Sequence, residues 1–358
     1  MAVEKTATAN GAQRLCPKKE RQEKMRKIKE YLRGRVLTSG SSPDREIKLK
    51  KREWWRDWRL YLMLIPGLLS LIVFSYVPMY GLQLAFKEYS PSLGIWNSPY
   101  CENIFDNFKY AVATDGFWRL VKNTLALGGL KIIFAFPSSI ILALMINEVS
   151  FKPFKKTVQT LSYLPYFISW IIVNSIVQIF LKSELTSNGA VLNNVIQALG
   201  GAPIDWYSEP QYWRAIITFT GIWKNMGWGT IVFLSALTNI NPNLYEAAQI
   251  DGAGYWARCR YVTIPGIMPV IGMTFVLSVS GIVKDDFEQI YALAGGGEGI
   301  LGQTMDVLGT WIYRCTKSTN FYSWGEATAV GMVQSLIGFV LVFASNWLLR
   351  KTGNEGLW

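Results

Sequence analysis

Long apolar runs constrain this chain more than any other feature of its sequence. A helix needs about 20 mostly apolar residues to cross a hydrocarbon core of about 30 Å. Within that core every backbone polar group must be bonded inside the protein, which favours helices. The sequence therefore predicts an all-α, polytopic membrane protein. Six runs qualify as transmembrane helices: Leu60 to Tyr80, Leu120 to Ile146, Val158 to Leu181, Tyr212 to Leu237, Ile264 to Val283 and Ala327 to Leu349.

The composition agrees with this interpretation and divides the chain. Of the 358 residues, 50% are hydrophobic and only 17% are charged, a balance that is typical of membrane proteins. Half of the 36 lysine and arginine residues lie before Leu60. We therefore expect a basic cytoplasmic tail with an interfacial segment over residues 1–59, a transmembrane domain over 60–349 and a short cytoplasmic tail over 350–358.

The basic residues also predict the orientation. Cytoplasmic segments beside membrane spans carry an excess of lysine and arginine, so the basic tail belongs inside and both termini are predicted to be cytoplasmic. The net charge of +11 does not indicate nucleic-acid binding, because the basic segment ends where a span begins. The tail is either solvated and disordered or an arm that touches lipid. Trp54, Trp55 and Trp58 suit an interfacial anchor.

Histidine and cysteine usage disfavours enzyme chemistry. The chain has no histidine, and its four cysteines are not spaced as metal ligands. A membrane-embedded enzyme is therefore not expected, and no metal site is predicted. Cys101 and Cys315 fall on the same outer side in this topology, so either a disulfide or two free thiols fits the pattern.

The loop between the fourth and fifth runs carries the clearest local signals. Asn241 suits a helix N-cap, Pro242 suits the first helical position, and Gly252 suits a left-handed stop. The pair Ala247 and Ala248 lets another surface approach closely, and Glu246 adds one acidic group. The loop is predicted to dock a partner.

A second short helix, over about Tyr255 to Tyr261, is expected after the glycine bend. Pro265 then opens the fifth span.

Glu246-Ala247-Ala248, Asp251-Gly252-Ala253 and Ile264-Pro265 resemble the EAA loop of membrane subunits in bacterial ATP-binding-cassette importers. The resemblance assigns ATPase coupling to residues 241–265, with Tyr245, Glu246, Ala247, Ala248, Asp251, Gly252, Ala253 and Pro265 at its centre.

The likeness runs from about Leu60 to the C-terminus and is greatest to oligosaccharide permeases of Gram-positive bacteria. Three further segments carry it: 76–81, 85–90 and 287–297.

The resemblance implies the type I importer permease fold and a set of partners. It implies a heterodimer with a second, homologous permease, two ATPase subunits that bind ATP and Mg²⁺, and an extracellular solute-binding protein. It places the chain in a bacterial plasma membrane, in contact with lipid and a sugar. The sequence contains no G-x-x-x-x-G-K-[ST] phosphate loop, so we expect no bound cofactor and no ATP hydrolysis in this chain.

The fourth run contains the first part of a candidate sugar site. Trp223, Asn225 and Trp228 combine aromatic faces with an amide, and Asn225 and Trp228 share a helix face because they lie three residues apart. Both resemble sugar-contacting positions of the maltose-importer membrane subunit. The alternative is that Trp223 and Trp228 only pack.

A charged cluster near the outer end of the fifth run is the second part. Asp285, Asp286 and Gln289 are predicted to contact substrate, and Asp286 resembles a sugar-contacting position; the alternative is that the cluster caps a helix. Lys224 and Lys284 suit a uronic-acid carboxylate, whereas the aspartates repel one, so the sign of the substrate stays open. Other polar residues in the runs are weaker candidates: Asn123, Lys131, Asn174, Gln178 and Gln334.

Two alternatives compete with an oligosaccharide importer. One is a permease of the same type for another class of solute. The other is a secondary transporter driven by an ion gradient, which predicts inverted repeats and broken helices around buried carboxylates. No convincing repeat is visible in the sequence, so the importer is favoured.

Overall fold

A computed structural model describes residues 58–182, 190–284, 286–297, 299–320, 322–353 and 356–357. These residues are helical apart from loops and one isolated bridge between Lys87 and Tyr100, which confirms the all-α prediction for the described chain. The chain separates into two units, Met1–Met79 and Tyr80–Trp358. The predicted tail, with Trp54 and Trp55, lies outside the described residues; Trp58 begins the first described helix.

The described part of the first unit contains α3 (Trp58–Leu71), a π-turn η1 (Ile72–Tyr76) and α4 (Val77–Met79). Its large apolar side chains, including Met63 and Phe74, are exposed. A helix that is apolar on all sides suits a lipid environment. The predicted span over Leu60 to Tyr80 is therefore helical, and the helical run extends to Phe86.

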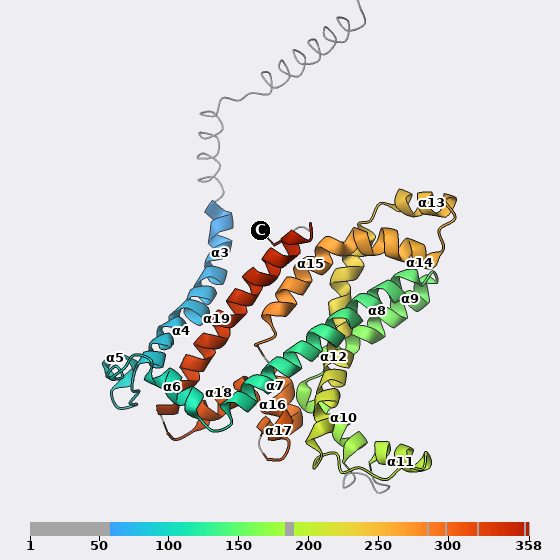
Figure 1. Ribbon diagram of the computed structural model, residues 1–358. Helices are drawn as coiled ribbons and strands as arrows, with labels where there is room; N and C mark the ends of the chain where they lie inside the picture. The colour runs from blue at the N-terminus through green and yellow to red at the C-terminus, as the bar shows by residue number, and fades with distance from the viewer. Residues whose placement is uncertain are drawn as a thin grey trace, which may run out of the picture. The chain divides into compact units, whose positions relative to one another are not determined.

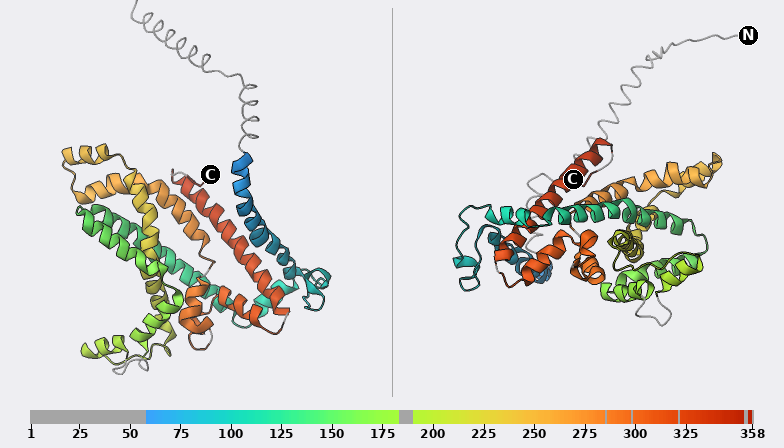
Figure 2. Two further views of the ribbon diagram at one scale, coloured as in Figure 1. Left: turned by 180° about the vertical axis from the view of Figure 1, so that it is seen from behind. Right: turned by 60° about the horizontal axis from the view of Figure 1, so that its bottom comes forward.

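The second unit is built around α12, which packs against α8, α9 and α15 (Figure 1). Its helices α15 and α19 also lie side by side (Figure 2). The bounds are η2 Tyr80–Phe86, α5 Gly94–Asn97, α6 Asp106–Ala113, α7 Phe117–Leu130, η3 Lys131–Ala135, α8 Phe136–Glu148, α9 Lys152–Tyr163, η4 Leu164–Phe167, α10 Trp170–Leu181, α11 Val191–Ala198, η6 Pro210–Tyr212, α12 Trp213–Thr238, α13 Pro242–Ile250, α14 Tyr255–Arg258, η7 Cys259–Thr263, α15 Ile264–Ser280, α16 Phe287–Ala294, η8 Gly295–Gly297, α17 Gly302–Met305, α18 Leu308–Lys317 and α19 Tyr322–Lys351.

Within the described chain, four helices are long and apolar enough to cross a membrane: Leu60–Phe86, Phe117–Glu148, Tyr255–Ser280 and Ser323–Lys351. Each overlaps a predicted span. The fourth predicted span corresponds to α12, whose 26 residues are long enough at about 1.5 Å per residue but include Arg214 and Lys224. The count of six spans stays a prediction.

The third predicted span is not one straight helix. Lys152–Phe167 and Trp170–Leu181 meet at an angle of 100°, so the pair is either a broken span or a re-entrant segment. Pro165 supplies no backbone N–H at the break, and the Ser169 side chain accepts a hydrogen bond from Ile172 N (3.4 Å), which starts a new helix. The long segments between the predicted spans also contain helices, namely α5, α6, α11 and α16–α18.

Prolines explain the three π-turns of the described chain. The turns η1, η3 and η7 each end two residues before a proline: Pro78, Pro137 and Pro265. A helical proline lacks an N–H and its ring crowds the carbonyl four residues earlier, and a widened turn relieves that crowding. Each span that contains such a proline therefore continues through it.

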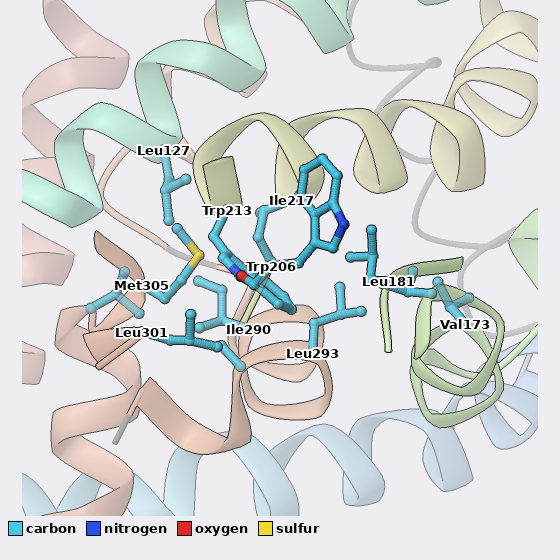
Figure 3. Close-up of a cluster of buried hydrophobic side chains, with 13 residues drawn as sticks. Leu127, Val173, Leu181, Trp206, Trp213, Ile217, Ile290, Leu293, Leu301 and Met305 are labelled. Atoms are coloured by element: carbon cyan, nitrogen blue, oxygen red, sulfur yellow. The ribbon is translucent and has the colours of Figure 1, made fainter. Parts of the chain in front are cut away.

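The largest buried cluster joins α12 to α7, α10 and α16 (Figure 3). Trp213, at the start of α12, is fully buried, and its indole Nε1 donates to Trp206 O at 2.7 Å. A second cluster joins α8, α12 and α15 through Ala143, Phe233 and Ile267. Because α12 contributes side chains to both clusters, it positions the helices that pack against it.

Two glycines allow unusually close contact between elements. A Cβ on Gly227 of α12 would overlap the backbone of Ser162 in α9, and a Cβ on Gly128 of α7 would overlap the backbone of Ile282. Backbone atoms cannot move aside as a flexible side chain can. Gly128 thus determines how closely the turn after α15 approaches α7.

The described cysteines are free and buried, so the two-thiol interpretation is the one the structure supports for Cys101 and Cys315. Burial raises the pKa of the Cys315 thiol to about 11, and burial also raises the pKa of Cys101. Both thiols therefore stay protonated and unreactive near neutral pH.

Gly128→Ala is expected to destabilise the protein by about 1 to 3 kcal/mol, because the new methyl group overlaps the Ile282 backbone. Gly129→Ala, the neighbouring change in the same helix, meets open space and serves as the control. Thermal unfolding of the purified protein in detergent measures both. Equal midpoints for the two variants would contradict the close contact.

Candidate functional site

The predicted docking helix is present as α13. The Asn241 side chain accepts a hydrogen bond from Asn243 N at 3.0 Å, which confirms the N-cap. At the other end Gly252 has a φ of +74°, and Ala253 N donates to Ala248 O at 2.9 Å. These features form a Schellman motif, in which a left-handed glycine ends the helix. The loop conformation thus follows from local sequence.

One face of this loop is unburied. Glu246, Ala247 and Asp251 are exposed, while Tyr245, Ala248 and Ala253 are half-buried. Two apolar side chains stand out, since Ile250 is 87% and Trp256 is 80% exposed. Exposed apolar groups beside the two carboxylates of Glu246 and Asp251 form a surface that suits a protein partner. In Figures 1 and 2, α13 lies at the end of the second unit opposite to α16 and α17.

The loop is mechanically connected to the fifth span. The Tyr245 hydroxyl and Thr263 Oγ1 lie 3.1 Å apart and form a hydrogen bond. The expected short helix over Tyr255 to Tyr261 is not separate, because α14, η7 and α15 form one continuous helix over Tyr255–Ser280. The π-turn before Pro265 removes the need for a break.

A cavity of about 560 Å³ lies beside α12. Residues of α7, η3, α8, α12, α15, α16 and the segment between α15 and α16 line it. Most of the lining is apolar, with a few polar groups, which is the usual character of a small-molecule site. The polar or aromatic groups relevant to binding are Lys131, Asn225, Trp228, Lys284, Asp286 and Gln289.

Asn225 and Trp228, which were predicted to share one face of a helix, both line this cavity. Asn225 is exposed, and its Nδ2 donates to Gly221 O at 3.0 Å. Trp228 stacks on Tyr166 with ring centroids 4.5 Å apart and an interplanar angle of 6°. Half of the Trp228 side chain stays open, so it offers a flat face to the cavity. Trp223 packs against the large buried cluster instead.

Asp286 joins the same cavity through an ion pair. Its carboxylate lies 2.7 Å from the Lys131 ammonium. Asp286 occupies the N-cap position of α16, yet its side chain makes no capping hydrogen bond, so the helix-capping alternative fails for this residue. Asp285, the other predicted aspartate, lies outside the described residues.

Gln289 is fully buried between α16 and α12. Its Nε2 donates to Ile217 O at 2.7 Å and to Thr220 Oγ1 at 3.0 Å. The carbonyl oxygen Oε1 has no hydrogen-bond partner within the described part of the chain. Because Gln289 also lines the cavity, this oxygen is available to accept a hydrogen bond from a bound molecule.

The structure gives Lys224 another role than we expected. Lys224 is buried and absent from the cavity lining; its Nζ donates to Tyr166 O at 2.7 Å and lies over the rings of Tyr166 and Trp170. It therefore holds the bend between α9 and α10. Lys284, the other expected carboxylate partner, does line the cavity.

Two of the weaker candidates bond neighbouring segments. Asn123 Nδ2 donates to Asp306 O at 2.9 Å, and its Oδ1 accepts from Arg214 Nη2 at 2.9 Å. Gln334 Nε2 donates to Val283 O at 3.2 Å. These contacts tie the outer segments to the helices.

Sequence reasoning missed the partners of the site. Lys131 was only one of several polar residues in the apolar runs, and its charge within such a run was the available signal. Tyr166 had no signal, because its contact with Trp228 joins residues far apart in the chain.

Lys224→Met is expected to destabilise the protein by about 1 to 3 kcal/mol, because it leaves Tyr166 O without its donor. Lys122→Met, at an exposed position, is the matched control. Unfolding midpoints in detergent compare the two; an unchanged midpoint for Lys224→Met would remove Lys224 from the bend.

Comparison with known proteins identifies the class of molecule. Residues 135–353 match the family model for the "binding-protein-dependent transport system inner membrane component". The chain is 39% identical to the protein LplB of Bacillus subtilis over 90% of this chain and 96% of that protein. It is 36% identical to the polygalacturonan/rhamnogalacturonan transport system permease protein YteP of the same species, over 84% of this chain and 90% of that protein.

A solved structure agrees in fold. A chain from the crystal structure of a bacterial alginate ABC transporter, in complex with an alginate pentasaccharide-bound periplasmic protein, superposes with a TM-score of 0.74 and 37% identity. The match covers 86% of this chain and 99% of that one.

Proposed function

Because the chain belongs to the family of inner-membrane components of binding-protein-dependent transport systems, we propose that it is the permease subunit of an ATP-driven oligosaccharide importer. One observation carries the proposal. The helix α15 lines a cavity that has an aromatic face and hydrogen-bonding groups, and the exposed α13 is hydrogen-bonded to the turn that leads into α15. The relatives support the substrate class, since YteP is a polygalacturonan/rhamnogalacturonan permease and the solved neighbour is an alginate transporter.

We also propose six spans with both termini in the cytoplasm. The spans are the four long apolar helices, the bent pair α9–α10, and α12. The C-terminal end of α19 and α13 point toward the same end of the second unit, which supports placing both in the cytoplasm (Figures 1 and 2). The corresponding segments are a tail over 1–59, a transmembrane domain over 60–349 with coupling loop 241–265, and a tail over 350–358.

The remaining parts of the proposed importer are partner subunits. They are a second, homologous permease that completes the pathway, two ATPases that bind ATP and Mg²⁺, and an extracellular solute-binding protein. Relatives from Bacillus support the plasma membrane of a Gram-positive bacterium as its location. This chain provides the passage and is not itself an enzyme.

The geometry suggests how movement of an ATPase partner is transmitted from α13 to the cavity. A partner that moves α13 also pulls Thr263 through the Tyr245 hydroxyl, and Thr263 lies in the continuous helix that becomes α15. Thr274 and Ser278 of α15 line the cavity together with residues of α12. Movement at the coupling loop is thereby converted into relative movement of α15 and α12, which is a hinge-type mechanism of alternating access.

Changes in the coupling loop are expected to uncouple the ATPase. Glu246→Lys replaces one negative charge of the docking surface by a positive one, and Gly252→Pro replaces a φ of +74° by about −65°. Each is expected to lower sugar-stimulated ATP turnover of the assembled transporter at least tenfold. Gly254→Ala, in the same loop with a φ of −68° and open space around it, is the control.

ATP turnover at the wild-type level in both loop variants would contradict the docking role of α13. Sugar uptake that persists in vesicles without any ATPase subunit would favour the ion-gradient transporter instead.

Trp228→Ala is expected to raise the half-saturating sugar concentration about tenfold, which corresponds to about 1.4 kcal/mol, because it removes the aromatic face of the cavity. Phe219→Ala, an exposed aromatic on the same helix outside the cavity lining, is the control. Sugar-stimulated ATP turnover of the reconstituted transporter measures both. An unchanged value for Trp228→Ala would remove it from the sugar path.

A further inference from the structure

The cavity carries a charge arrangement that an importer of neutral sugars does not need. We propose that it selects acidic sugars, with the carboxylate of a uronate ring bound by Lys131 and Lys284, while Asp286 holds Lys131 in position. This inference rests on the proposed function, because it assumes that the cavity is the sugar path. It goes further by naming the charge of the substrate and the residues that read it.

The position of Lys131 is built by the packing around it. Gly128, one turn earlier in α7, lets the backbone of Ile282 approach without a gap. That contact brings the segment after α15 against α7, so that Asp286 lies 2.7 Å from the Lys131 ammonium. Lys131 also begins the π-turn η3, and such turns are frequent at functional sites.

The described lining of the cavity has more positive than negative charge. It includes the lysines Lys131 and Lys284 and one carboxylate, Asp286. A cation within a membrane protein is costly unless it is paired or faces water, so two ammonium groups that line one cavity suit an anionic ligand.

Lys131 can accept a second anion without losing its first. An ammonium group has three N–H donors, and the ion pair with Asp286 needs only one of them. The side chains of Lys131 and Asp286 are 29% and 47% exposed, so the pair is open to the cavity. The Asp286 carboxylate thus fixes the direction of Lys131 and leaves donors available for a substrate carboxylate.

Two neighbouring groups make the ligand a sugar acid rather than a small inorganic anion. The buried Gln289 Oε1 has no partner in the described chain and can accept a hydrogen bond from a hydroxyl, a group that chloride and sulfate do not carry at neutral pH. Trp228 supplies a flat apolar face that suits the C–H side of a ring. A carboxylate, hydroxyls and an apolar ring face occur together in a uronate.

The test uses the complete transporter, reconstituted in lipid nanodiscs with its partner subunits and binding protein. Two probes of equal length are titrated: an oligogalacturonate, and the neutral oligosaccharide made by reducing its carboxylates to alcohols. The readout is the half-saturating concentration for stimulated ATP turnover. The same binding protein delivers each probe to wild type and variant, so the variant-to-wild-type ratio reports the permease alone.

Lys131→Gln is expected to raise the half-saturating concentration of the oligogalacturonate at least tenfold and to change that of the neutral probe less than twofold. Lys131→Arg, which keeps the charge, should restore most of the loss. Asp286→Asn removes the carboxylate that positions Lys131 but keeps the ammonium group, so it should weaken the oligogalacturonate less than Lys131→Gln does. Lys122→Gln, an exposed lysine on the same helix, is the matched control and should leave both probes unchanged.

Other results would overturn the proposal. If Lys131→Gln weakens both probes equally, or if Lys131→Arg fails to restore the acidic one, Lys131 has only a structural role. A wild-type transporter that takes the two probes equally well also contradicts selection of acidic sugars. If neither probe stimulates wild-type ATP turnover while a non-sugar solute does, the proposed oligosaccharide function fails, and this inference fails with it.

Discussion

The close packing of α12 against its neighbours is the constraint on which the rest of the second unit depends. Its first turn anchors the large buried cluster through Trp213, and Phe233 near its end joins the cluster with α8 and α15. Between them, Gly227 allows contact with the Ser162 backbone, and Thr230 Oγ1 donates to Ser139 O at 3.1 Å. The cavity exists beside this helix because α12 is held along its whole length.

Two lysines within the predicted spans show how a membrane protein accommodates charge. Lys224 donates a hydrogen bond to the Tyr166 carbonyl, and Lys131 pairs with Asp286. The first is sealed in the protein and stabilises a bend. The second faces a cavity, which is where a charge can serve binding. Burial therefore distinguishes a lysine that only holds the fold from one that is open to a ligand.

The coupling loop and the cavity are joined by one continuous helix, although it contains Pro265 and a proline often ends a helix. A π-turn over Cys259–Thr263 accommodates Pro265, so α14 and α15 remain one continuous helix. The Tyr245–Thr263 hydrogen bond attaches α13 to that helix. Because a continuous helix transmits displacement better than a flexible linker, the partner proposed to bind α13 would act directly on the wall of the cavity.

The sequence by itself determined the features that depend on local or one-dimensional patterns. Apolar runs predicted the helices, and the cap and stop at Asn241 and Gly252 predicted α13, because backbone hydrogen bonding within a few residues decides both.

Only the tertiary structure decided which polar residues meet. The burial of Lys224 against the Tyr166 carbonyl and the pairing of Lys131 with Asp286 arise between segments far apart in the chain, where close packing and not residue spacing selects the neighbour.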